Sequence, residues 1–550
     1  MPKLSPLDRP RGGCDSCFKI IMSASKSTTW SPLRLPLFRA LWLAAVASNV
    51  GTWMHNVGGE WLMTTLAPTP LLVALMQTAE TAPTFLLALP AGALADIVDR
   101  RRLLIFSQAW MLVAAVGLAV ATLAGITTPG VLLVLTFALG LGAAMNAPAW
   151  QAIVPELVPR HELTSAVSLN SVAFNIARAV GPALGGIIVA AAGPWAVFLL
   201  NSCSFVGVIF VLYRWRREKV ESISPTERVV GAMRAGLRYA RHAPELKSVL
   251  VRTGAFALCA SALWATLPLV ARTELKLNAF QYGVLLGCLG VGAVLGAFAI
   301  GWARHRVSNN LLVVLGTVVF ALATAALGYL TNYALLAVAL LLGGVAWMTT
   351  MSSLNVSVQT AVPEWVRARA LALYLLVFFG SLAVGAAAWG AVAERVGLGT
   401  ALFAAAAALL VGLAATPFFP LRGGESLDLN PSLHWTEPTF IQEPHPEHGP
   451  VLVTVEYLID PARAGEFARA MQDMKRILRR DGATRWGLFV DTARPGRYLE
   501  TFLVESWAEH MRQHARVTNE DRAVQERARA FHVGDTPPVV THLVAENGRQ

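Results

Sequence analysis

The most informative property of this sequence is how little charge it carries. Charged residues make up only 14% of the 550 residues, whereas a soluble chain has roughly 25%. Hydrophobic residues reach 55%, and the mean hydropathy is +0.53. So few charges cannot cover a water-facing surface of this size. A fully soluble protein is therefore excluded, and lipid must cover much of the chain.

Several motifs are also missing or incomplete. No GxxxxGK[ST] sequence is present, so we do not expect this chain to be driven by ATP. Cys14 and Cys17 form a lone CxxC, which is a weak metal or redox signal without a second pair. Cys203, Cys259 and Cys288 fall in apolar runs, as packing residues do. We therefore expect neither a cofactor nor a metal.

The N-terminus lacks the features of a cleavable signal peptide. The apolar run from Ile20 to Met22 is too short for its hydrophobic core. Met22 is followed by a polar stretch and is an alternative start of translation. In that case the CxxC would not belong to the protein.

The positive charge is unevenly distributed. Residues 450–550 carry 15 Lys and Arg against 14 Asp and Glu, so almost all of the net charge of +11 lies in residues 1–449. Such an excess is compatible with nucleic-acid binding or with the cytoplasmic loops of a membrane protein. The apolar runs between the charges favour the second interpretation, so no nucleic acid is expected as a partner.

A membrane span needs roughly 20 mostly apolar residues, and twelve segments meet this requirement. We expect an all-α polytopic membrane protein with spans near residues 38–65, 70–95, 103–125, 130–153, 166–191, 194–213, 249–271, 280–302, 310–330, 333–358, 368–393 and 397–419. With the N-terminus inside, the cytoplasmic loops hold 17 Lys and Arg and the opposite loops only three. The positive-inside rule thus places both termini in the cytoplasm.

The two halves of the chain are related in sequence. Gly92-Ala-Leu-Ala-Asp96 closes the second span, and Gly296-Ala-Phe-Ala-Ile300 closes the eighth, 204 residues later. Ala179-Val-Gly181 with Gly186 recurs as Ala383-Val-Gly385 with Gly390 at the same offset. Two parallel six-helix repeats are the plan of the major facilitator fold, with the substrate path between them.

These features divide the chain into six regions. They are a cytoplasmic tail (1–36), a six-helix bundle (37–214), a linker (215–248), a second bundle (249–420), a second linker (421–449) and a soluble domain (450–550). The first linker contains an amphipathic helical pattern flanked by Arg234, Arg238 and Arg241, which we interpret as a helix on the membrane surface. The last region has a β-α-β-β-α-β pattern, which predicts an α+β, ferredoxin-like domain.

Ionisable groups within apolar spans are costly and indicate functional sites. Glu80 and Arg178 are each expected near the membrane midplane. They could form an ion pair that stabilises packing, or a proton or substrate site, and the sequence leaves both open. Glu60 lies nearer the outer face beside Trp61, where it either lines the mouth of a cavity or, as we slightly favour, reaches outer water.

Two motifs resemble those of major facilitator transporters. Gly92 to Asp96, followed by Asp99, Arg100, Arg101 and Arg102, resembles the loop between spans two and three. That resemblance implies that Asp96 contacts the opposite half and helps to lock the outward-facing state. Ile97 stands where an Arg is usual and Asp99 where a Gly is usual.

The other motif, Gly181-Pro182-Ala-Leu-Gly185-Gly186, resembles the span-five motif of antiporters in this superfamily. Pro182 can kink its helix, and the glycines would allow close packing across the moving interface. The span at 130–153 carries no charge, so the Arg of drug–proton antiporters is missing. This departure puts a standard scheme of proton coupling in doubt.

Residues 48–54, 154–160 and 362–370 are similar to the enterobactin-exporter-like branch of this superfamily, the transmembrane secretion effectors. The resemblance implies a proton-coupled exporter of small amphiphilic molecules, siderophores or drugs, in a bacterial inner membrane. Spans one, four, seven and ten line the path in this superfamily. Each cavity candidate on spans one and ten could equally be packing polarity: Asn49, Trp53, His55, Asn56, Met348, Ser352, Asn355 and Gln359.

The soluble domain resembles the dimeric α+β barrel group, which includes small quinol-type monooxygenases. A site there could be formed by Arg485, Trp486, Trp507, His510, His514 and His532. His510 and His514 have the spacing of metal ligands on a helix but no evident third ligand. We favour a dimerisation or regulatory module, with a membrane-anchored enzyme or sensor as the alternative. The repeat and the buried charges favour the transporter, because a simple anchor needs neither.

Overall fold

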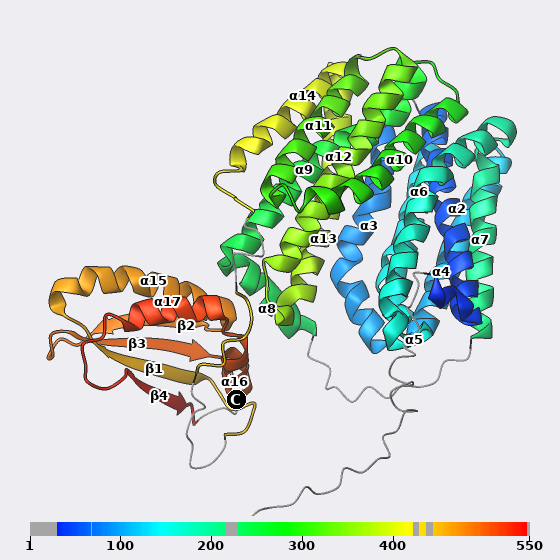
Figure 1. Cartoon of the computed structure of the whole chain (residues 1–550). Helices are drawn as coiled ribbons and strands as arrows, with labels where there is room; N and C mark the ends of the chain where they lie inside the picture. The colour runs from blue at the N-terminus through cyan, green and yellow to red at the C-terminus, as the bar shows by residue number, and fades with distance from the viewer. Residues whose placement is uncertain (1–29, 68, 216–228, 422–427, 436–443, 547–550) are drawn as a thin grey trace, which may run out of the picture.

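The computed structural model of the chain describes residues 30–67, 69–215, 229–421, 428–435 and 444–546. Cys14, Cys17 and Met22 lie outside these residues. Figure 1 shows a large bundle of long helices and, beside its lower end, a small domain built on one sheet. The bundle therefore forms one part of the molecule and the C-terminal residues the other.

The first half of the bundle contains six long helices that follow the expected spans closely. They are α2 (Pro36–Leu66), α3 (Pro70–Ile97), α4 (Arg100–Leu123), α5 (Pro129–Leu157), α6 (Leu163–Ala192) and α7 (Pro194–Arg214). Short 3-10 turns, η1 (Ser31–Arg34) and η2 (Arg160–Glu162), precede α2 and α6. Proline begins four of the helices, where its missing N–H leaves no hydrogen bond unmade.

The second half repeats this arrangement. It comprises α9 (Pro244–Leu269) with a π-helical turn η3 (Val270–Glu274), α10 (Ala279–Ala303), α11 (Asn309–Tyr329), α12 (Tyr333–Thr360), α13 (Glu364–Val396), α14 (Leu398–Gly412) and a 3-10 turn η4 (Leu413–Ala415). Side chains cap three of these helices at their N-termini, namely Asn278 at α10, Ser308 at α11 and Asn332 at α12.

The repeat is visible in backbone geometry. Gly193 ends α6 with φ +94°, and Gly397, 204 residues later, ends α13 with φ +86°. A positive φ at the end of a helix favours glycine, which has no Cβ to clash with the backbone. Gly186 of α6 packs on α10, and Gly390 of α13 packs on α3. Equivalent helices of the two repeats therefore make equivalent contacts with the opposite half.

Eleven helices among the described residues are long and apolar enough to cross a membrane. The exception is α2, although it has 31 residues. Polar side chains such as Asn49, Asn56 and Glu60 lower the hydropathy of this helix. The structure thus supports eleven of the twelve expected spans on composition, and the remaining expected segment is the long helix α2, which packs among the others.

The C-terminal domain has a four-stranded antiparallel sheet in the order β2-β3-β1-β4. The strands are β1 (Val451–Leu458), β2 (Arg485–Val490), β3 (Arg497–Val504) and β4 (Val539–Val544), and η6 (Pro461–Arg463) leads into α15 (Ala464–Asp481). The expected order of elements is confirmed, except that the second helical stretch is divided into α16 (Trp507–Arg516) and α17 (Asn519–Arg529).

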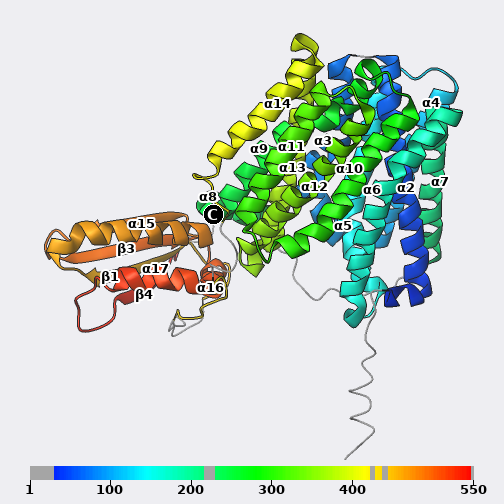
Figure 2. The same cartoon turned by 45° about the horizontal axis from the view of Figure 1, so that its top comes forward.

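The linker helix α8 (Val229–His242) contacts the C-terminal domain, whereas we expected it to lie along the membrane surface. Figures 1 and 2 both show this domain beside α8. Arg238 Nη2 donates to Glu509 Oε1 of α16 at 3.0 Å. The Arg516 guanidinium lies 4.4 Å from the ring centre of Trp365, which in turn packs edge-on against Tyr239. This face of α8 therefore packs against side chains of the protein, Glu509 of α16 and Trp365 of α13.

Candidate functional site

Two adjoining cavities, each of about 260 Å³, lie at the centre of the helix bundle. The first is formed by both halves, with walls from α2, α3, α6, α9, α10, α12 and α13. The second lies mainly within the first half, between α2, α3, α4, α5 and α7. Asn56, Glu80, Thr81 and Phe379 line both. The two cavities share these walls, and together they form one candidate site.

The polar wall of the site begins on α2. Trp53, Asn56 and Glu60 are spaced by three and four residues, which places them on one helix face. All three line the first cavity. Asn56 Nδ2 donates to Glu80 Oε2 of α3 at 3.3 Å. Adjacent helices thus direct polar side chains at the same space.

Glu60 is buried, with 9% of its surface exposed. The Tyr282 hydroxyl of α10 donates a hydrogen bond to Glu60 Oε2, and Trp61 stacks on the Tyr282 ring at 5.8 Å between centroids. The slightly favoured expectation that Glu60 reaches outer water is therefore wrong, because Tyr282 covers it. Its hydrogen bond joins the two halves of the bundle.

Arg178 lies between aromatic rings rather than beside a carboxylate. Its guanidinium carbon is 6.0 Å from the ring centre of Trp53 and 5.8 Å from that of Trp264. Within the described structure it forms no ion pair with Glu80, and its Nε has no hydrogen-bond partner. Each aromatic face can stabilise the cation by about 0.5–2 kcal/mol. Of the two alternatives left open by the sequence, the packing ion pair does not form here, and Arg178 is a cation held between the two halves.

The second half of the bundle gives the cavity an aromatic wall. Trp264, Trp347 and Phe378 pack in succession, with centroids 5.3 Å and 6.1 Å apart, and Phe379 adjoins them. Sequence reasoning missed this wall, because aromatic residues within apolar spans do not stand out from the core. The site therefore combines acidic and amide groups from one half with aromatic surface from the other.

The expected cavity residues on the first span divide into two groups. Trp53 and Asn56 line the first cavity, and His55 and Asn56 line the second. The His55 ring packs against Phe198 at 4.5 Å between centroids. Asn49 lines neither cavity.

The expected residues on the tenth span do not line the described cavities; Trp347 is the α12 residue that does. Ser352 accepts hydrogen bonds from Arg304 at both its carbonyl and its hydroxyl oxygen. Gln359 donates to Asn355 at 2.7 Å, and Met348 lies against Gly296 of α10. Met348, next to Trp347, packs on α10, and the other three lie one or more turns further along α12.

The basic cluster after α3 holds the first half together. Asp99 caps α4 by accepting from the Arg102 backbone N–H at 2.9 Å. Arg100 pairs with Glu156 of α5 at 2.9 Å, and Arg101 donates to carbonyl oxygens at the end of α7. Gly92 and Asp96 belong to the last turns of α3, and the Asp96 side chain lies outside the described residues.

The span-five motif packs α6 on both sides. A Cβ at Gly181 would lie 2.5 Å from Trp53 Cβ, and one at Gly185 would lie 2.9 Å from the Met54 backbone, both on α2. A Cβ at Gly186 would instead lie 2.6 Å from a carbonyl oxygen of α10. Across this interface, the Pro182 carbonyl oxygen faces Gly283 of α10. One of the three expected glycines thus serves the interface between halves, together with Gly283 and Gly290, which the sequence analysis did not single out.

The expected site in the C-terminal domain is brought together only in part. His510 and His514 line a cavity in this domain, and Glu500 on its wall accepts from Trp486 at 2.8 Å. His532 bonds to the backbone of Leu458 and Thr536 instead. Trp507 packs against His510, whereas Arg485 is exposed.

Two related six-helix halves around a central cavity define a transporter of the major facilitator fold. A bacterial homologue of the human lysosomal transporter Spinster, solved in an inward-facing and occupied conformation, matches with a TM-score of 0.58 at 15% identity, over 70% of this chain and 96% of that chain. An inward-facing bacterial homologue of the iron transporter ferroportin matches with a TM-score of 0.56 at 17% identity, over 70% of this chain and 99% of that one.

The chain belongs to the transmembrane secretion effector family, whose profile matches residues 27–550. This is a family of transporters and not of enzymes. The chain is 26% identical to the enterobactin exporter EntS of Escherichia coli O1:K1 over 360 residues, which is 64% of this chain and 85% of the relative. It is also 26% identical to EntS of Salmonella choleraesuis over 382 residues, 68% of this chain and 89% of the relative.

Proposed function

We propose that this protein exports small amphiphilic molecules, siderophores or drug-like compounds, by alternating access coupled to protons. The observation that carries the proposal is the central cavity, where Glu60, Glu80 and Arg178 face an aromatic wall from the opposite half. Such a wall suits rings and alkyl groups, while the charged groups suit a polar or acidic end. The relationship to enterobactin exporters supports a siderophore as one candidate substrate.

The described contacts between halves suggest the state and the orientation. They gather where α6 ends and α10 begins, and where α3 begins and α13 ends, at the end remote from α8 and the C-terminal domain. If the excess of positive charge faces the cytoplasm, this closed end is the outer one and the state is inward-facing. In this arrangement α2 is the twelfth span, and both termini lie inside a bacterial inner membrane.

Proton coupling would centre on Glu60. Opening the outer end must separate α6 from α10 and remove the Tyr282 hydroxyl from the Glu60 carboxylate. A carboxylate that loses its donor in a cavity must be solvated, paired or protonated. Arg178, held between Trp53 and Trp264 of opposite halves, would also lose one aromatic partner in this movement. The glycine motif of α6 and the basic cluster at Asp96 to Arg102 would act as gates.

Transport by the purified protein in liposomes tests this proposal. A catecholate siderophore and a cationic dye should each be screened with and without a pH gradient, in the wild type and in Glu60→Gln. We expect gradient-driven accumulation that Glu60→Gln reduces at least 10-fold, while Glu364→Gln, whose side chain is 90% exposed, retains it. Accumulation that ignores the gradient would exclude proton coupling, and a fully active Glu60→Gln would remove Glu60 from the path.

We also propose that the C-terminal domain is a ferredoxin-like module that dimerises the transporter and regulates it. The sheet face turned away from the helices exposes large apolar side chains, with Leu458, Phe489, Val539 and Leu543 each 43–59% exposed. Two such faces packed together would form a dimeric α+β barrel. Light scattering in detergent should show a dimer that Phe489→Asp and truncation after residue 424 both convert to a monomer.

A further inference from the structure

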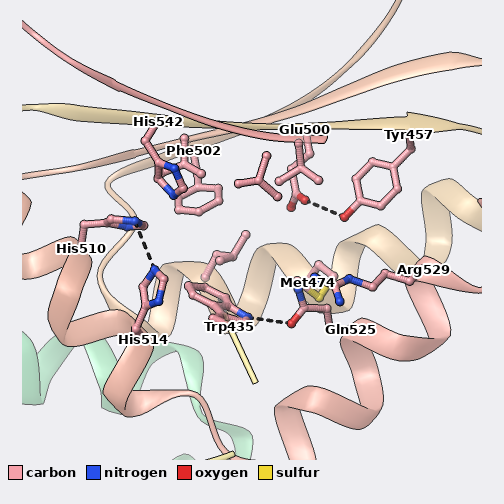
Figure 3. A pocket seen from close by; sticks show the side chains of 14 residues that line it. Trp435, Tyr457, Met474, Glu500, Phe502, His510, His514, Gln525, Arg529 and His542 are labelled. Carbon is pink, nitrogen blue, oxygen red and sulfur yellow. Dashed lines mark hydrogen bonds between the residues drawn. The ribbon is translucent and has the colours of Figure 1, made fainter. Parts of the chain in front are cut away.

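Three histidines meet in the C-terminal domain, although they come from separate parts of the chain. His510 and His514 lie one turn apart on α16, and His542 lies on β4. Figure 3 shows the three imidazoles together at one end of a cavity of about 260 Å³. One ring nitrogen from each lies within 4.8 Å of the others. The widest separation in this group exceeds the spacing of ligand atoms around one ion, so the three rings form a cluster that must tighten to bind a metal.

The distance between the first two ligand atoms supports such a site. His510 Nε2 and His514 Nε2 are 3.3 Å apart. Zinc–nitrogen bonds of about 2.0–2.1 Å at tetrahedral angles place two ligand atoms roughly 3.3–3.4 Å apart. The pair on α16 is therefore already spaced as two ligands of one ion. A small movement of the His542 side chain would bring its ring nitrogen to the same spacing.

Rigid elements hold these side chains in place. Ser506 caps α16 by accepting from the Glu509 backbone N–H. His542 pairs with Val453 of β1, a residue on the sheet face that packs against the helices. Because side chains alternate along a strand, His542 points into the cavity while Leu543 points to the opposite face. Both sides of the cluster thus belong to regular structure.

Neighbouring groups leave the ring nitrogens suited to a metal. His510 Nδ1 lies 3.4 Å from the Oε1 atom of buried Gln513, and a hydrogen on Nδ1 directed at this acceptor would leave Nε2 its lone pair for a metal. Metal-binding histidines commonly donate their second N–H in this way. Trp435 packs edge-on against His514, and Trp507 lies beside His542. This aromatic shell shields the cluster from water on two sides.

The ligand set determines the class of ion. Three neutral imidazoles suit zinc, copper, nickel and cobalt, whereas magnesium and calcium prefer carboxylate and carbonyl oxygens. Glu500, the acidic residue lining the same cavity, is bonded to Tyr457 and Trp486. We propose that His510, His514 and His542 bind one divalent transition-metal ion of the zinc class, with a fourth ligand supplied from the cavity.

Metal titration of the full-length protein tests this site. The protein is purified in detergent without a polyhistidine tag, stripped with a chelator and titrated with Co²⁺, then challenged with Zn²⁺. We expect one Co²⁺ per chain with the intense visible absorption of a tetrahedral ion, displaced by Zn²⁺. His514→Ala and His542→Ala should each abolish this absorption, and Gln513→Ala should lower the affinity about 10–100-fold.

The control distinguishes this cluster from surface histidines. His445 and His448 are exposed, with ring centroids 5.4 Å apart, and could bind metal weakly. His445→Ala should leave the Co²⁺ spectrum unchanged. X-ray absorption at the zinc edge of the wild type needs no variant and should show three imidazole ligands. Absence of the tetrahedral spectrum, its survival in His542→Ala, or its loss in His445→Ala would each overturn the proposal.

Discussion

Glu500 offers a prediction whose magnitude follows directly from its surroundings. The side chain lies on β3 with 1% of its surface exposed. It accepts hydrogen bonds from the Tyr457 hydroxyl at 3.2 Å and from Trp486 Nε1 at 2.8 Å. Burial raises the pKa of Glu500 from 4.5 to about 7, and the two hydrogen bonds only partly oppose this. The folded domain therefore holds the Glu500 proton more tightly than the unfolded chain does.

The sign of the pH effect follows from this difference. Below pH 4.5 both states are protonated and the folded domain has its full stability. Between pH 4.5 and about 7 the unfolded chain releases the proton while the folded domain keeps it, so stability falls as the pH rises. At 1.36 kcal/mol per pH unit, the loss is about 3 kcal/mol. Glu500→Gln resembles the protonated side chain and should escape this loss.

Hydrogen–deuterium exchange measures this effect in the intact transporter. Peptides covering β1 and β3 report opening of the C-terminal domain, and a chelator keeps metal out of the cavity. With intrinsic exchange rates corrected for pH, wild-type protection should fall across this range and Glu500→Gln should gain up to about 3 kcal/mol of relative stability at pH 8. Parallel pH profiles for both proteins, or a variant less stable at pH 8, would refute the reasoning.

Three further changes test the other contacts. Gly186→Val should prevent closure of the halves, since its Cβ would meet α10, and spin labels on the two halves should report longer distances at that end. Arg238→Glu should weaken docking of the C-terminal domain by about 1.5–3 kcal/mol, seen as faster exchange in α8. Arg178→Lys keeps the charge but not the planar guanidinium, so substrate affinity should fall about 10-fold, near 1.4 kcal/mol.

Sequence reasoning succeeded where the signal is local or repeated. The expected spans coincide with long helices because apolar length is a property of each segment alone. Gly186 and Gly390 were recognised through their shared offset, and both prove to face the opposite half. The role of Gly283 was not predicted, because its partner on α6 is distant in sequence. The sequence around a glycine in an apolar span does not indicate which helix the glycine faces.

The chemistry of the sites was harder to foresee, because it depends on which residues meet. Pairing of Arg178 with Glu80 was one of two open alternatives, yet the fold brings Trp264 of the other half to Arg178. The spacing of His510 and His514 fits metal ligands, but no metal was expected because a third ligand was not evident; the third imidazole near them, His542, is placed by the β1–β4 pairing. A strand register decides which face His542 occupies, and no local pattern in the sequence reports it.

The linker helix α8 contacts the C-terminal domain through α15 and α16. Glu509, which binds Arg238 of α8, is the neighbour of His510 on α16. Helix α8 lies in the linker between the two halves. Any ligand of the C-terminal cavity that displaces α16 must therefore change the contact between α16 and α8. Coupling of this kind is reciprocal: if metal binding alters the docking of α8, the conformation of the transporter alters metal affinity by the same factor. Metal affinities of the wild type and of Arg238→Ala therefore measure directly whether the domain senses the state of the transporter.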